Sequence, residues 1–391
     1  MKRVQLVILN IVLFLYQFEF IPFEGSEGLL SFYRVGIFPL LILYLIISRN
    51  KVYKNEIPMY IIVFLFFYFN IISIIGYGYY SSLITVFGNF IQFLVAYIYF
   101  RDNRLEKSTL YVLSTWGLFQ LPYFITSLIS GNLGLANRFM GFHWDPNYLC
   151  MSLLISFWAK IYLIRKDLSK PIKIVLLSLS VFDILMILFS LSRGGLLALI
   201  LTGLIYLFIY HRKLFYILAI GFIVLVSYML ERSRWVTWSD SLSLMDLIIY
   251  RTFVIAETGD ISAGRIDLIS NYISVLKKGD GVFFGIPLNY YIENMNKGGY
   301  PHNAIIEILL QGGVIIGGVF YLFILYCISK ILYYSLKFNK LPYEFLFILS
   351  GVSVLMFLSF TLKISWLFVG LIFAISKRKI FSYNYVLTPV K

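Results

Sequence analysis

Several polar and cationic residues lie near the ends of long apolar runs, where their side chains could face a shared cavity. The set contains four arginines, two histidines, one aspartate and two asparagines: Arg138, His143, Asp145, Asn147, Arg193, Arg251, Arg265, His302 and Asn303. An arginine guanidinium can bind phosphate oxygens through two parallel hydrogen bonds. Arg265 also follows Ser262, a predicted helix N-cap, and helix N-termini bind anions. The set therefore predicts a site for a phosphorylated lipid or a lipid-linked group.

Several of these residues also have a simpler interpretation. Arg251 is equally well explained as an anchor to lipid headgroups. For His143, which lies between two aromatic residues, a packing role is preferred over catalysis. The Asp-Pro-Asn motif at 145–147 is typical of a helix N-cap followed by a first-turn proline. Headgroup anchoring explains Arg193 less well, because this residue lies in a Ser-Arg-Gly-Gly break between two apolar runs that brings backbones close. Asp183 falls in the middle of an apolar run, where an ionisable group needs a partner that the sequence does not identify.

The sequence contains no motif typical of nucleotide binding or of metal binding. There is no G-x-x-x-x-G-K-[ST] loop for a nucleotide and no D-x-D pair for a metal-bound sugar diphosphate. The three histidines, His143, His211 and His302, are too far apart in sequence to suggest a zinc site. We expect neither a metal nor another cofactor. The net charge of +14 is spread over short loops, so nucleic acid is not an expected partner.

The composition indicates that these residues are positioned by membrane-spanning helices. Of the 391 residues, 60% are hydrophobic and only 13% are charged, with a mean hydropathy of +0.85. A soluble domain has about 25% charged residues, and no soluble fold of this size could bury so much apolar surface. The predicted fold class is therefore an all-α, polytopic integral membrane protein.

Apolar runs of sufficient length predict about twelve transmembrane helices. They lie at residues 4–21, 29–48, 57–75, 83–100, 108–130, 146–164, 172–191, 194–210, 214–230, 304–329, 343–360 and 364–376. The predicted organisation is nine helices in residues 1–230, one large outward loop at 231–301, and three helices with a cytoplasmic tail in 302–391. Most of the 33 Lys and Arg residues fall on alternate loops together with both chain ends. Because cytoplasmic loops are the basic ones, both termini are predicted to be cytoplasmic.

The large loop carries two segments with helical character. Residues 240–256 are apolar enough to resemble a span, but a crossing there would place the basic tail outside, so a re-entrant or interfacial helix is the preferred interpretation. Residues 262–279 begin at the N-cap candidate Ser262 and end at Gly279, with apolar residues at helical spacing between them. They predict an amphipathic helix on the outer membrane surface.

Four stretches together resemble the O-antigen ligase and polymerase superfamily, which comprises bacterial enzymes of surface polysaccharide synthesis. They are 138–147 (RFMGFHWDPN), 192–199 (SRGGLLAL), 262–269 (SAGRIDLI) and 301–313 (PHNAIIEILLQGG). The resemblance implies a metal-independent inverting glycosyltransferase in the bacterial cytoplasmic (inner) membrane. The implied substrates are glycan repeat units carried on undecaprenyl diphosphate, with membrane lipid and a chain-length regulator as further expected partners. Gln311 departs from the acidic residue that the resemblance leads us to expect.

The resemblance carries over to three arginines and one histidine: Arg138, Arg193, Arg265 and His302. A diphosphate is a good leaving group, so the reaction needs cations to stabilise its developing charge, and Arg193 and Arg265 are the candidates. His302 is the candidate base for the acceptor hydroxyl. The predicted substrate-binding residues are Arg138, Asp145, Asn147 and Asn303.

Three functions fit these features to different degrees. A polymerase that extends a repeat-unit chain on its lipid carrier is the preferred one. A ligase that transfers the finished chain to lipid A–core uses the same chemistry and shares the motifs. A flippase for lipid-linked sugars would be expected to show internal repeats, which we do not detect.

Overall fold

The computed structural model describes residues 2–18, 36–48, 53–80, 82–102, 106–133, 138–141, 145–236, 243–250, 270, 273–274, 284–294, 303–338, 342–355 and 363–377. Within these ranges the regular structure is helical and contains no strand, which confirms the all-α class. The first nine α-helices are α1 (Lys2–Tyr16), α2 (Phe38–Ile47), α3 (Ile57–Gly76), α4 (Ser82–Asp102), α5 (Lys107–Leu118), α6 (Leu121–Ile129), α7 (Pro146–Ile164), α8 (Lys170–Phe189) and α9 (Arg193–Tyr210). The others are α10 (Arg212–Ser233), α11 (Leu244–Ile249), α14 (Leu288–Asn294), α15 (Ala304–Gly312), α16 (Gly318–Phe338), α17 (Tyr343–Leu355) and α18 (Lys363–Lys377), with a 3-10 turn η2 (Lys54–Glu56) and a π-helical segment η4 (Gly313–Gly317).

Eight helical segments of the described chain are long and apolar enough to cross a membrane. They are α3, α4, the α5–α6 pair, α7, α8, α9, α10, and the continuous α15–η4–α16 segment. The predicted count of about twelve is not confirmed, because α1, α2, α17 and α18 have only 15, 10, 13 and 15 described residues. At 1.5 Å per residue a helix needs about 20 residues to span the hydrocarbon core. The protein is nevertheless an integral membrane protein by its eight apolar segments.

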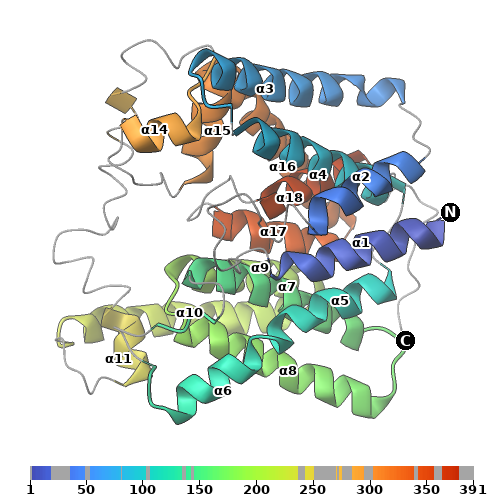
Figure 1. The fold of residues 1–391 in the computed structure, drawn as a ribbon. Helices are drawn as coiled ribbons and strands as arrows, with labels where there is room; N and C mark the ends of the chain where they lie inside the picture. Colours follow the sequence, from blue (N-terminus) through green and yellow to red (C-terminus); the bar gives the residue numbers. More distant parts are fainter. Residues whose placement is uncertain are drawn as a thin grey trace.

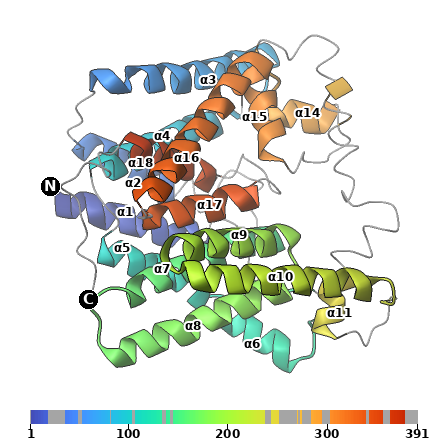
Figure 2. The ribbon, with the colours of Figure 1, turned by 180° about the vertical axis from the view of Figure 1, so that it is seen from behind.

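The helices form two groups that meet along a central seam (Figure 1). One group contains α3, α4, α16 and α18, with α2, α14 and α15 packed against it. The other contains α5, α7, α8 and α9, with α10 lying along α9 at the surface (Figure 2). Two helices join the groups: α17 packs on α7, α9 and α18, and α1 packs on α5 and α2.

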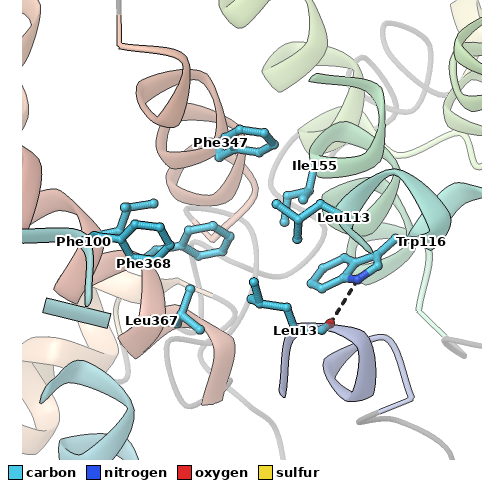
Figure 3. A pocket seen from close by; sticks show the side chains of 9 residues that line it. Leu13, Phe100, Leu113, Trp116, Ile155, Phe347, Leu367 and Phe368 are labelled. Atoms are coloured by element: carbon cyan, nitrogen blue, oxygen red, sulfur yellow. Dashed lines mark hydrogen bonds between the residues drawn. The ribbon is translucent and has the colours of Figure 1, made fainter. Parts of the chain in front are cut away.

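The seam is apolar and nearly filled. Nine side chains from α1, α4, α5, α7, α17 and α18 surround a cavity of about 30 Å³ (Figure 3). Trp116 is its largest lining residue, and the indole Nε1 donates a hydrogen bond to the Leu13 carbonyl at 3.1 Å. This bond gives the one polar atom of a buried tryptophan a partner. Packing at the seam therefore fixes the two groups relative to each other.

The last part of the large predicted loop folds onto one end of the first group, away from the start of α1 (Figure 1). Ser73 Oγ of α3 donates to the Gly285 carbonyl at 3.1 Å, and the Ile286 amide donates to the Leu310 carbonyl at 2.6 Å. Tyr79 Oη donates to Glu293 Oε2 at 2.8 Å, beyond the end of α3. Residues 284–294 are thus anchored to both α3 and α15.

The remainder of that loop is described only in part. α11 covers six residues of the apolar segment 240–256 and packs on the end of α10, where Ile249 contacts Met229 and Val236 in a small buried cluster. Arg232 Nε and Asp246 Oδ1 form an ion pair at 3.3 Å beside it. Residues 251–256 and nearly all of the predicted amphipathic helix at 262–279 lie outside the described residues.

Candidate functional site

The start of α7 is set by an aspartate cap. Asp145 has extended backbone angles, and its Oδ1 accepts hydrogen bonds from the amides of Asn147 at 2.7 Å and Tyr148 at 3.3 Å. Pro146 occupies the first helical position, where no backbone N–H is needed. The N-cap interpretation of the Asp-Pro-Asn motif is therefore confirmed. The Asp145 carboxylate thus caps the N-terminus of α7, and the Asn147 side chain contacts a neighbouring element.

That neighbouring element is the turn between α8 and α9. Ser192 is the N-cap of α9, and its Oγ accepts from the Gly195 amide at 3.0 Å and lies 2.5 Å from Asn147 Oδ1, to which it donates. Leu191 has a φ of 50°, a left-handed conformation that costs a residue other than glycine free energy. The turn is held by side-chain bonds on both flanks, which can offset this cost.

Arg138 is one of the residues that hold this turn. Its Nε donates to the Ser190 carbonyl at 3.0 Å and its Nη2 to the Leu191 carbonyl at 3.4 Å. The Phe139 amide donates to the Phe189 carbonyl at 3.2 Å, so the segment 138–141 runs against the end of α8. The last carbonyl groups of a helix have no partner within the helix, and a guanidinium there can donate to them. Its positive charge also interacts favourably with the negative end of the helix dipole. The half-buried Arg138 thus binds the protein backbone at the candidate site.

A close contact between α7 and α9 accounts for the second glycine of the Ser-Arg-Gly-Gly break. A Cβ at Gly195 would lie 2.3 Å from Cys150 Sγ and 2.5 Å from Cys150 Cβ. The Cys150 thiol lies 3.0 Å from Ser190 Oγ, which also donates to the Ile187 carbonyl at 2.6 Å. At Gly195 the close approach is to the Cys150 side chain of α7, so this glycine lets α7 and α9 pack closely.

Arg193 is the first residue of α9 and is half-buried. It follows the Ser192 cap directly, so its side chain starts where the free amides and the positive end of the helix dipole lie. Both features favour an anion. The structure therefore gathers four predicted residues around one turn: Arg138, Asp145, Asn147 and Arg193.

The other predicted residues are not part of this described cluster. Asn303 is the N-cap of α15, and its Oδ1 accepts from the amides of Ile305 at 3.0 Å and Ile306 at 3.3 Å. The side-chain oxygen of Asn303 is therefore used to cap the N-terminus of α15. His302 and Arg265 lie outside the described residues, as do His143 and Arg251. In the described part of the chain, no three His, Cys, Asp or Glu side chains lie close enough to hold a metal ion.

The glycines after Gln311 have structural roles. A Cβ at Gly312 would lie 2.7 Å from the Phe66 ring of α3, and Gly313 has a φ of 70°. The π-helical segment η4 begins there and joins α15 to α16. Such π segments are frequent near functional sites, because they change the direction in which a helix presents its side chains.

The structure also supplies the partner of Asp183. Lys160 Nζ of α7 lies 2.6 Å from Asp183 Oδ2 of α8 and 2.9 Å from Ser156 Oγ. Both charged side chains are about 1% exposed. Gly117 of α5 leaves room for the carboxylate, since a Cβ there would lie 2.0 Å from Asp183 Oδ1. Sequence reasoning missed Lys160, although a lysine inside an apolar run is a signal of the same kind as the aspartate.

A protein-family model described as O-antigen ligase matches residues 175–322. The matched region contains the α8–α9 turn, α9 and three of the four stretches that carry the sequence resemblance. The resemblance to the O-antigen ligase and polymerase superfamily is therefore confirmed over this region. No curated protein matches the chain.

Proposed function

We propose that this protein polymerises a surface polysaccharide, transferring a lipid-diphosphate-linked glycan to a sugar hydroxyl at the outer face of the bacterial cytoplasmic membrane. The family match supports an activity of the O-antigen ligase and polymerase type, with lipid-linked glycans as substrates. The observation that carries the proposal is the arginine-containing turn at the start of α9, which lies inside the matched region.

The proposed reaction is a single displacement at the anomeric carbon. The acceptor hydroxyl oxygen forms a bond to this carbon while the carbon–oxygen bond to the diphosphate breaks, so the configuration inverts. The hydroxyl proton passes to His302, and the bond electrons leave with the diphosphate. Arg193 and Arg265 stabilise the negative charge that develops on it.

The remaining residues of the cluster position these groups. Arg138 and Asn147 hold the α8–α9 turn through the bonds described above, and Asp145 fixes the start of α7. An anion-binding side chain on such a restrained turn loses little conformational entropy when substrate binds. We therefore assign Arg138, Asp145 and Asn147 to positioning the substrate and the turn, and Asn303 to ordering the start of α15 next to His302.

A ligase is the second candidate, because the family match supports an activity of either type. Gel analysis of surface glycan after deletion of the gene distinguishes the candidates. Loss of the proposed polymerase leaves acceptor lipid with a single repeat unit. Loss of a ligase leaves no repeat on the acceptor and polymer on the carrier, whereas loss of a flippase traps the precursor inside. Either of the last two patterns contradicts the proposal.

A further inference from the structure

A second pocket lies in the other helix group, near the end that carries α14. Its volume is about 210 Å³, far above the roughly 10–15 Å³ that one water requires. It is bounded by α3, α4, α15 and the docked segment 284–294. The lining residues are Asn70, Ile74, Ser82, Thr85, Val86, Asn89, Pro287, Leu288, Asn289 and Gln311.

Amide side chains dominate the polar part of this pocket. Asn70 Nδ2 donates to Gln311 Oε1 at 3.2 Å, and these residues are 3% and 6% exposed. Asn89 is 4% exposed, and its Oδ1 has no hydrogen-bond partner among the described residues. Buried polar atoms are nearly always hydrogen-bonded, and leaving one without a partner costs about 1–3 kcal/mol. The Asn89 oxygen therefore marks a place for a hydrogen-bond donor from a ligand.

The charge of the pocket restricts that ligand. None of its described lining residues is ionisable at neutral pH. A phosphate or carboxylate would lose its hydration here without meeting a cation among these residues, which is strongly unfavourable. Ile74, Val86 and Leu288 supply apolar surface beside the amides. Amides next to apolar surface suit a molecule with hydroxyl groups on its rim and C–H groups on its faces.

We infer that this pocket binds one uncharged sugar ring of the glycan substrate, separately from the diphosphate. The inference rests on the proposed function, and it assigns sugar recognition to α3, α4 and α15 while the arginine-containing turn takes the diphosphate. A ring hydroxyl donates to Asn89 Oδ1, and the Asn70–Gln311 pair supplies further donors and acceptors. Gln311 is neutral where the resemblance leads us to expect an acid, which fits a neutral sugar.

The docked loop segment forms one wall of the site. Gly285 has a φ of 76°, and a Cβ there would lie 2.4 Å from the Leu310 carbonyl oxygen. Asn289 Nδ2 of α14 donates to Ser82 Oγ of α4 at 3.1 Å, and both residues line the pocket. The geometry of this wall thus depends on the backbone contact at Gly285 as well as on side chains.

The test uses the full-length protein in lipid nanodiscs and the oligosaccharide of one repeat unit, released from its lipid carrier by mild acid. Binding is measured by saturation-transfer NMR for the wild type, Asn89→Leu and Gln311→Leu. The matched control is Asn10→Leu, which removes an amide of α1 that accepts a hydrogen bond from Thr109 and is not among the lining residues of the pocket. Thr85→Phe, at a half-buried lining position, fills the pocket without removing an amide.

We expect each amide variant to weaken oligosaccharide binding by roughly 3- to 10-fold, the loss typical of one neutral hydrogen bond. Thr85→Phe should abolish binding, and Asn10→Leu should bind as the wild type does. Contacts to the non-reducing end of the fragment would identify the sugar as the acceptor's, and contacts to the reducing end as the donor's. If one of the amide variants fails to fold, Thr85→Phe still tests the site.

Two further outcomes separate this inference from the proposed function. In the first, the wild type turns over lipid-linked repeat units but either does not bind the fragment or binds it no better than the pocket variants do. The pocket then holds only water, and the inference is wrong. If the wild type and variants bind the fragment as expected but no lipid-linked unit is turned over, the sugar site stands and the proposed function is contradicted.

Discussion

At the scale of single residues, the two arginines of the described cluster have different surroundings. Arg138 donates to two backbone carbonyls beyond the end of α8, so its guanidinium is engaged by the protein itself. Arg193 starts α9, where backbone amides and the helix dipole add to its positive charge. Its place at the helix N-terminus makes Arg193 our candidate for contact with the diphosphate, and its backbone bonds make Arg138 our candidate for holding the turn.

We expect Arg193→Lys to reduce polymer formation by roughly one to two orders of magnitude. An ammonium cannot reproduce two parallel hydrogen bonds to a diphosphate, and a charged hydrogen bond contributes about 1.5–3 kcal/mol. The rate is measured with purified protein and lipid-linked repeat units, at equal protein abundance. Arg212→Lys, at the start of α10, is the matched control and should be silent. Wild-type activity of Arg193→Lys would make Arg193 a headgroup anchor.

A second residue-scale prediction concerns His302 and pH. A general base must be neutral, and a free imidazole has a pKa of about 6.5. Activity should therefore fall as the pH drops through a single ionisation near roughly pH 6.5. His302→Ala should lose this acid limb and roughly two to four orders of magnitude in rate. A variant that keeps the same limb would place the base elsewhere.

At the scale of elements, the contact between α7 and α9 depends on a missing side chain. Gly195→Ala would place a methyl group within 2.5 Å of Cys150, so the helices must separate or the turn must shift. Such overpacking costs about 1–3 kcal/mol, and the free energy of unfolding should fall by that amount. Gly203→Ala is the control, because nothing lies within 4 Å of a Cβ at that position of the same helix.

The same contact predicts a rescue. Adding Cys150→Gly to Gly195→Ala removes both sulfur and Cβ from the crowded position and should restore part of the lost stability and activity. Thermal unfolding in detergent and polymer formation are measured for the single and double variants. If the double variant is no better than the sum of the single ones, the contact between these two residues does not limit the approach of the helices.

The pairing of α7 with α8 depends on a buried charge pair. Asp183→Asn leaves Lys160 charged and without its carboxylate inside the bundle, so we expect a loss of about 3–5 kcal/mol in stability. Replacing both residues, with Lys160→Met and Asp183→Leu, should recover most of it, because an apolar pair avoids the desolvation cost. Ser180→Ala on α8, which removes only a bond to the Leu176 carbonyl, is the control. Equal melting temperatures for Asp183→Asn and Ser180→Ala would contradict a stabilising role of the Lys160–Asp183 pair.

The sequence predicts elements better than it predicts contacts between them. The helix start at Pro146 follows from the Asp-Pro-Asn motif and the start at Ala304 from the apolar run 304–329, and the structure places both as expected. The capping role of Asn303 was not predicted. The bond from Arg138 to the end of α8 and the Lys160–Asp183 pair join segments that are far apart in the chain. Periodicity and capping carry no information about such partners. The amide pocket was missed for the same reason, since it needs α3, α4 and α15 together.

At the scale of the whole molecule, the arginine-containing turn and the amide pocket lie in different helix groups. The arginine-containing turn belongs to the group of α7, α8 and α9, and the amide pocket belongs to the group of α3, α4 and α15. The predicted outward loop at 231–301 connects α10 of one group to α15 of the other. A substrate with a charged lipid-diphosphate end and a neutral glycan end matches this division. Such a match requires that both regions face the same side of the membrane.

The topology can be tested by labelling in intact cells. The distribution of Lys and Arg places Lys213, in the short turn between α9 and α10, inside, and Lys297, in the large loop, outside. A membrane-impermeant thiol reagent should therefore label Lys297→Cys once the outer barrier is permeabilised, and Lys213→Cys only after the cytoplasmic membrane is opened. The native cysteines Cys150 and Cys327 are buried and should give little background. Labelling of Lys213→Cys in intact cells would put the α9–α10 turn outside. The arginine-containing turn, at the opposite end of α9, would then face the cytoplasm, and the proposed reaction at the outer face could not occur there.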